Sequence, residues 1–256
     1  MKLALLNMSS VRNDDMARIA DALKVGLTHV TDAWERSPID VAFMPGTKTA
    51  PIGWAPLVAF EQAEQPDAAY EGYHDLDEQG RPYGRAFRNM IPGGAILHDP
   101  AGAGASLAAV LAHEAAEMAL DLMANAWIDA PFSDPRTFHG YGQVALELAD
   151  PVQELTYQID VDGIPVDFSD FIYPAWFDRR AAGVKFDHMG ALKTPLTLAP
   201  GGYVIVRDNK ADRQVFARLL GRRVPGVRKV PAIQPQAAWR ETMKKLPGGR
   251  TRRRMG

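Results

Sequence analysis

The first sixty residues contain three apolar runs and one amphipathic segment. Residues 2–8 (KLALLNM) form a run suited to a strand, and residues 14–34 then carry Met, Ile, Leu and Val at helical spacing. Residues 39–44 (IDVAFM) and 56–60 (PLVAF) supply two further runs of strand length. The order strand, helix, strand predicts an N-terminal βαβ unit.

The middle of the chain mixes strand, turn and helix patterns. The turn residues EQGRP precede GRAFRNMI at 84–91, which predicts an edge strand. An apolar segment at about 105–125 predicts a buried helix. Residues 155–177 and 196–208 alternate as strands do, with turns at DVDG and PGG, and predict β-hairpins. Together these elements predict an α+β domain with a mixed sheet over residues 1–221.

The C-terminal segment, residues 222–256, has a different composition. It is rich in Pro, Arg and Lys, lacks periodicity and includes RTRRR at 250–254. Such segments commonly become ordered only on a partner. We therefore expect an extended arm that docks onto other proteins.

The helix segment at 111–121, LAHEAAEMALD, places charged residues in an otherwise apolar run. Helical geometry puts Glu117 one turn from His113 and Asp121 one turn further on the same side. With Glu114 and Ser106 these residues form a polar wedge of about 100°. For an ordinary amphipathic helix, such a wedge simply faces water. Here it carries no Lys or Arg, so the carboxylates would repel one another unless a cation neutralised them.

The order His-Glu-x-x-Glu favours a metal site over a solvent-facing surface. His113 and Glu117 can bind one ion from successive turns, as in the metalloprotease helix HExxH, with the second histidine replaced by Glu. Because the chain has no cysteine, the ligands must be N and O atoms. We predict Zn²⁺ as the cofactor and Glu114 as the general base that takes a proton from the metal-bound water.

A tetrahedral zinc site needs one more protein ligand and a water. The first choice is Glu147 in VALELADPVQ, because gluzincins take their third ligand as a Glu from a later element. Asp150 in the same segment could orient His113 through its other ring nitrogen. Asp121 is the competing third ligand. His74, in GYHDLD, could contact a substrate or the metal, but a solvent-exposed loop histidine is the favoured interpretation.

Several of these motifs together resemble a group of zincin-like proteins encoded in tailed-phage genomes. They are the stretch GYHDLDEQGRPYGRAF, the helix AHEAAEMALD, the segment ELADPVQ and the stretch FSDFIYPAWFD, and the resemblance spans roughly residues 70–205. It implies a zincin-like metalloprotease fold and a component of the phage particle. Glu117 departs from the standard zincin helix, in which a second His stands.

Two functions follow from these observations. The first is a virion-associated zinc metallopeptidase that hydrolyses peptide bonds of a protein substrate. The second is a structural head or tail protein that keeps the zincin fold as a scaffold and contacts other virion proteins through the arm, within an oligomeric particle. Glu114 favours catalysis and the arm favours assembly.

Composition restricts the partners and the location. The net charge of −2 argues against a protein that coats nucleic acid, except through its Arg-rich tail. The short apolar run at the N-terminus is below the length of a signal peptide core or a membrane span. We expect a soluble protein, in the host cytoplasm during assembly and then in the virion.

Overall fold

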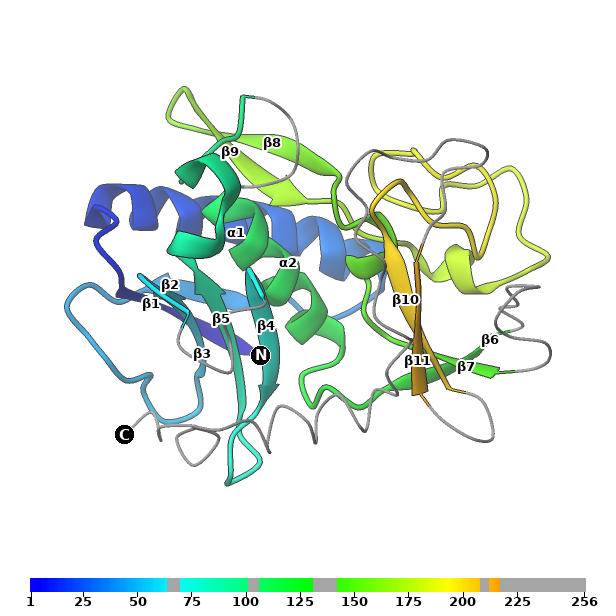
Figure 1. The fold of residues 1–256 in the computed structure, drawn as a ribbon, viewed down its shortest axis with the longest axis horizontal. Helices are drawn as coiled ribbons and strands as arrows, with labels where there is room; N and C mark the ends of the chain where they lie inside the picture. The colour runs from blue at the N-terminus through cyan, green and yellow to red at the C-terminus, as the bar shows by residue number, and fades with distance from the viewer. Residues whose placement is uncertain (64–69, 101–105, 131–141, 208–211, 217–256) are drawn as a thin grey trace.

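The structure is a computed structural model that describes residues 1–63, 70–100, 106–130, 142–207 and 212–216 (Figure 1). These described residues include two long helices, α1 (Asn13–Ala33) and α2 (Leu107–Leu120). Short 3₁₀ turns are η2 (Arg88–Met90), η3 (Pro92–Gly94), η4 (Asp150–Val152) and η5 (Pro174–Phe177). The strands are β1 (Lys2–Met8), β2 (Asp40–Phe43), β3 (Ala55–Phe60), β4 (Gly72–Leu76), β5 (Pro82–Phe87), β6 (Trp127–Ala130), β7 (Gly142–Ala145), β8 (Thr156–Val161), β9 (Ile164–Ser169), β10 (Tyr203–Arg207) and β11 (Asp212–Phe216).

The N-terminal half forms a mixed five-stranded sheet in the order β2-β1-β3-β5-β4. Strands β2, β1, β3 and β5 are parallel, and β4 pairs antiparallel with β5 at the edge. Because side chains alternate along a strand, Leu3 and Leu5 of β1 join the main core, whereas Ala4 and Leu6 join a smaller cluster on the opposite face.

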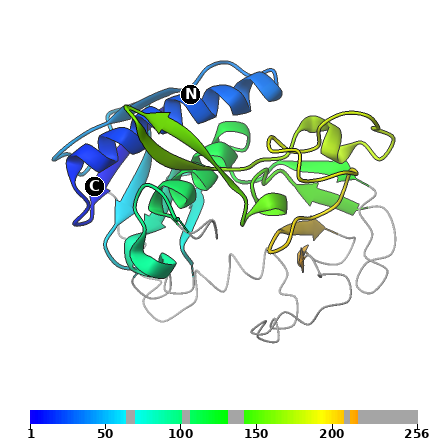
Figure 2. The ribbon, with the colours of Figure 1, turned by 90° about the horizontal axis from the view of Figure 1, so that it is seen from above.

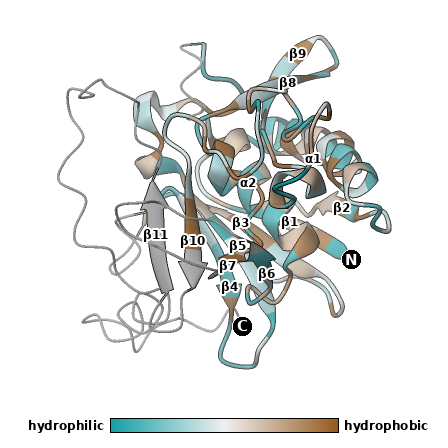
Figure 3. Cartoon of the chain, turned by 90° about the vertical axis from the view of Figure 1, so that its right-hand side faces the viewer, coloured by the Kyte–Doolittle hydropathy of each residue, from teal (hydrophilic) through white to brown (hydrophobic). Residues whose placement is uncertain are grey.

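The two helices lie between this sheet and the β8–β9 hairpin, which crosses above them in two perpendicular views (Figures 1 and 3). α1 and α2 pack against each other and against β9. Phe168 of β9 is fully buried in this layer. Figure 2 shows the same arrangement from above, with the second sheet beside the helices. That sheet has the strand order β11-β10-β7-β6.

The predicted α+β class and the N-terminal βαβ unit are confirmed, since β1 and β2 are parallel and joined through α1. The DVDG turn is also confirmed as the β8–β9 connection, where Asp162 and Gly163 have positive φ. The expected edge strand at 84–91 is wrong. Its residues begin within β5, an inner strand, because the preceding GYHDL segment pairs outside it as β4.

The arm predicted at 222–256 falls outside the described residues, so the proposed domain boundary stays a prediction. Among the described residues, no helix has the length and apolar character needed to cross a bilayer.

Candidate metal centre

α2 is buried along nearly its whole length, and this excludes a solvent-facing role for its acidic residues. Ser106 is the N-cap, and its side chain accepts a hydrogen bond from the Ala109 backbone N–H at 3.1 Å. Glu114 and Glu117 are only 5% and 3% exposed. Buried carboxylates of this kind require compensation by positive charge or hydrogen bonds.

The first partner of these carboxylates is His74 on β4, where the sequence had indicated an exposed loop histidine. That expectation is wrong, because the His74 side chain is 6% exposed and points at α2. Its cross-strand neighbour is Gly84 of β5, where a Cβ would collide with Leu57 of β3 and lie tightly against Met118 of α2, while a Cβ at Gly72 would collide with Val110 of α2. The two glycines therefore let β4 and β5 approach the helix closely enough for His74 to reach Glu114 and Glu117.

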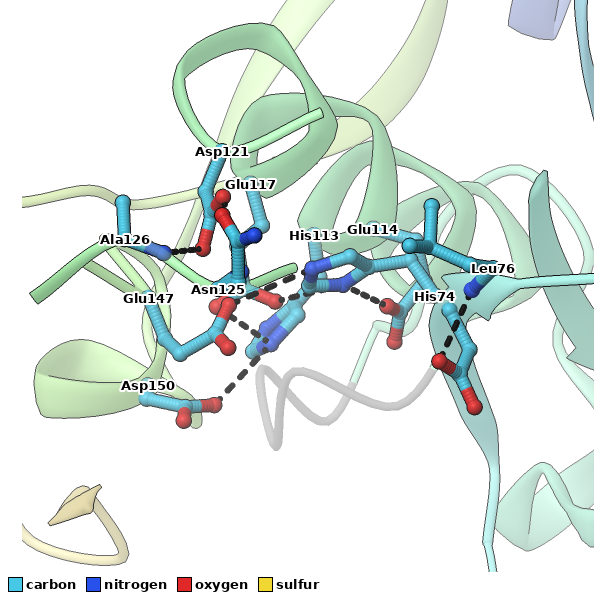
Figure 4. A network of polar contacts seen from close by, with 11 residues as sticks. His74, Leu76, His113, Glu114, Glu117, Asp121, Asn125, Ala126, Glu147 and Asp150 are labelled. Carbon is cyan, nitrogen blue, oxygen red and sulfur yellow. Dashed lines mark hydrogen bonds and ion pairs between the residues drawn. The ribbon is translucent and has the colours of Figure 1, made fainter. Parts of the chain in front are cut away.

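The second set of partners comes from the segment that follows β7. Glu147 and Asp150 are 8% and 3% exposed, and both carboxylates point toward the histidines (Figure 4). Glu147 Oε2 lies 3.3 Å from His74 Nε2, and Asp150 Oδ1 lies 3.3 Å from His113 Nε2. Asp150 also meets the hydroxyl of Tyr203 on β10.

Glu117 is the centre of the cluster because its two oxygens face different histidines. Oε1 lies 3.2 Å from His113 Nε2, and Oε2 lies 3.3 Å from His74 Nδ1. The cluster contains two candidate ligand groups, and within each group the ligand atoms lie within 4.8 Å of one another. The first group is His113, Glu117 and Asp150, and the second is His74, Glu114 and Glu117. Each group offers one imidazole nitrogen and two carboxylate oxygens, which is a donor set for a divalent cation.

The structure arranges the predicted ligands differently from the sequence-based assignment. His113 and Glu117 do converge. Asp150 faces the same His113 nitrogen as Glu117 does, instead of the opposite one. Glu147 faces His74. Asp121, the competing ligand, accepts hydrogen bonds from the Asn125 and Ala126 backbone N–H groups at 3.0 and 2.8 Å, so both of its oxygens serve the end of α2.

The proton affinities of the cluster reflect its burial and its crowded charges. Burial, which disfavours the charged ring, is outweighed by the carboxylates around His74 and His113, so the pKa of each histidine is well above its ordinary value. Burial together with the other carboxylates raises the pKa of Glu147 well above its ordinary value and that of Asp150 to about 7. For Glu117, burial is outweighed by the two histidines, and its pKa falls to about 2.

Three buried polar atoms in the described part of the cluster lack a hydrogen bond. Within the described part of the chain, His74 Nε2, Glu117 Oε1 and Glu147 Oε2 have no hydrogen-bond partner, although an atom of opposite character lies within about 3.3 Å of each. Such buried polar atoms in native proteins call for an explanation such as an ion. The donors are imidazole and carboxylate, which suit Zn²⁺ and, with this many oxygens, also Mn²⁺ or Mg²⁺. The residues therefore fit a divalent metal whose identity they leave open.

His74 is the site residue for which sequence reasoning favoured the wrong interpretation, a loop histidine in solvent. The turn EQGRP was recognised, and a hairpin partner for the strand after it would have been GYHDL. Alternation along that strand places Gly72, His74 and Leu76 on one face, so a hairpin interpretation would have directed His74 toward the helix.

A cavity of about 460 Å³ lies away from the metal cluster, between residues 49–56 and 77–83.

Compared with known proteins, this chain matches no family model, no curated protein and no solved structure. The resemblance to phage zincin-like proteins therefore gains no support from a relative. What the molecule does provide is a buried group of His, Glu and Asp side chains that could hold a metal ion.

Proposed function

We propose that this protein is a metal-dependent hydrolase that cleaves peptide bonds with a metal-activated water. The support for the metal is the buried convergence of His113 and Glu117 with Asp150. A divalent cation there would lower the pKa of a bound water to about 7 and supply hydroxide at neutral pH.

The position of His74 on an edge strand supports a peptide as the substrate. Within the described residues, β4 is the edge strand of the five-stranded sheet and pairs with β5. An extended peptide that adds to such an edge is held by main-chain hydrogen bonds. Because His74 stands in the middle of β4 and reaches the cluster, a peptide paired along β4 would run past the metal-binding side chains.

The remaining parts of the sequence-based hypothesis stay predictions. Glu114 as general base is one; its carboxylate lies 3.2 Å from His74 Nδ1, and burial raises its pKa. Zn²⁺ as the physiological metal is another, as is a place in a phage particle among other virion proteins. The scaffold alternative depended on the arm at 222–256, which is outside the described residues.

The experiment compares the metal-depleted protein with the protein reloaded with Zn²⁺, each incubated with an unstructured test protein. We expect cleavage only after reloading, and in His113→Ala a lower Zn²⁺ content together with loss of cleavage. His98→Ala is the matched control, because His98 pairs with Asp167 at 2.8 Å outside the cluster. Bound Zn²⁺ without cleavage of any test protein would show that the centre is not catalytic under these conditions and would leave the scaffold function.

A further inference from the structure

We infer that the cluster is a two-metal centre in which Glu117 bridges two divalent cations. This inference rests on the proposed metal-dependent function and specifies the site further. The key observation is that the two candidate ligand groups are distinct but share Glu117, with one of its oxygens turned to each histidine. A carboxylate used in this way is suited to hold two ions at the separation of about 3.5–4 Å found in two-metal hydrolases.

The first cation position is defined by His113 Nε2, Glu117 Oε1 and Asp150 Oδ1. Glu117 Oε1 is buried and has no hydrogen-bond partner among the described residues, so it is free to bind a metal. The Tyr203 hydroxyl meets the Asp150 carboxylate from β10 and would fix its orientation. Contacts of this kind around a ligand raise metal affinity by holding the ligand in place.

The second cation position is defined by His74 Nδ1, Glu114 Oε2 and Glu117 Oε2. When Nδ1 binds a metal, the proton of the neutral ring must be on Nε2. That nitrogen faces Glu147 Oε2 at 3.3 Å, and neither atom has a hydrogen-bond partner elsewhere among the described residues. Glu147 is thus placed as the outer carboxylate of a carboxylate–histidine–metal arrangement. In this assignment Glu114 is a ligand of the second cation instead of a general base. The two cations would then activate the water.

Charge supports two ions over one. Glu114, Glu117, Glu147 and Asp150 are all buried, and the ion pairs they make within the described residues go only to His74 and His113. Two divalent cations with neutral histidines neutralise four carboxylates. A single divalent cation would leave two negative charges that protons would have to balance, and uncompensated buried charge is costly. Asp121 is not counted among the ligands, because both of its oxygens accept hydrogen bonds from the Asn125 and Ala126 backbone N–H groups.

The test is titration of the chelator-treated full chain with Mn²⁺, followed by calorimetry and by electron paramagnetic resonance. We expect two Mn²⁺ per chain and an exchange-coupled spectrum from neighbouring ions. In His74→Ala we expect one Mn²⁺ with an uncoupled spectrum, and in His98→Ala two coupled ions as in the parent. The parent spectrum alone tests the inference if a variant does not fold.

One Mn²⁺ per chain in the parent, with an uncoupled spectrum, would overturn the two-metal inference while leaving a single-metal hydrolase intact. Two ions whose spectra remain uncoupled would also overturn it, because the Glu117 bridge requires them to be adjacent. Binding of neither Mn²⁺ nor Zn²⁺ would overturn the metal-dependent function together with it.

Discussion

His74 Nδ1 and Glu117 Oε2 lie 3.3 Å apart and join the edge strand β4 to the buried helix α2. The contact links the edge strand of the five-stranded sheet to a helix that is buried along nearly its whole length. The cluster thus has a fixed part on α2 and a part whose position depends on β4. Substitutions in the two parts should have different consequences.

Glu114→Gln separates the two roles considered for this residue. Gln keeps the size and a carbonyl oxygen but loses the charge and cannot accept a proton. As a ligand of the second cation, Glu114 is needed for binding, so we expect the Mn²⁺ content to fall from two to one. As a general base alone, it would leave the metal content unchanged while the peptidase rate fell by about 10²–10⁴-fold. Metal analysis beside a cleavage assay decides between these results.

Glu147→Gln tests whether this residue is an outer carboxylate or a direct ligand. Loss of an outer-shell partner typically weakens metal affinity by about 10–100-fold without removing the site. We expect a decrease of that size for the cation at His74 and no change for the cation at His113, measured by calorimetry with Mn²⁺. Complete loss of one ion would contradict the outer-shell role and restore Glu147 as a ligand.

Asp121→Ala should affect stability and spare the metal. The substitution removes the charged carboxylate that accepts hydrogen bonds from the Asn125 and Ala126 backbone N–H groups. At roughly 1.5–3 kcal/mol for each hydrogen bond to a charged group, we expect the free energy of unfolding to fall by about 3–6 kcal/mol. Urea denaturation of the metal-free protein measures this loss. A reduced metal content in folded Asp121→Ala would instead support the ligand role first considered.

Asp170→Asn should change how stability depends on pH. Asp170 and Asp187 are both fully buried, and burial with the adjacent Asp187 raises the pKa of Asp170 to about 8. The native state therefore keeps a proton that the unfolded chain releases near pH 3.8. The associated stability is fully present below that pH and is lost as pH rises to about 8, by up to roughly 1.4 kcal/mol per pH unit.

The Asn variant resembles the protonated acid and has no such proton to lose. Its side-chain oxygen can still accept from the Phe171 N–H, which Asp170 Oδ1 meets at 2.8 Å. We expect its unfolding free energy to fall less between about pH 5 and pH 8 than that of the parent, with both proteins metal-free. Parallel pH profiles would show that Asp170 is not the protonated member of the pair.

Gly26→Ala tests the contact between α1 and β9. A Cβ at Gly26 would overlap the ring of Phe168, which is 0% exposed. The gain in helix propensity, up to about 1 kcal/mol, is smaller than an overpacking cost of roughly 1–3 kcal/mol. We expect a lower melting temperature. Val25→Ala at the exposed neighbouring position should have little effect, and equal melting temperatures for the two variants would contradict tight packing at Gly26.

The sequence predicted those features that depend on local periodicity. The apolar runs of β1 and β3 and the spacing of Met16, Ile19 and Leu23 in α1 are sufficient to identify these elements. His113 and Glu117 were found because one helical turn fixes their relation. β4 was not predicted, since GYHDL contains Gly, His and Asp, residues that give no strong strand signal.

Partner choice within the cluster required the tertiary structure. Glu147 and Asp150 are close in sequence and equally suited to bind metal, and both lie on an irregular segment at η4. No periodic pattern in the sequence predicts which of the two carboxylates faces which histidine. The observed pairing depends on how β4, α2 and η4 meet, and those contacts join residues far apart in the chain.

The short edge strand β4 also determines how the cluster can open. Its five residues pair with β5 and pack against α2, and separating them from the sheet breaks far fewer contacts than global unfolding does. The amide protons of β4 should therefore exchange with solvent deuterium faster than those of α2, and bound metal should slow the exchange of β4 in particular. Release of the cation at His74 would then proceed by fraying of one sheet edge while the rest of the molecule stays folded.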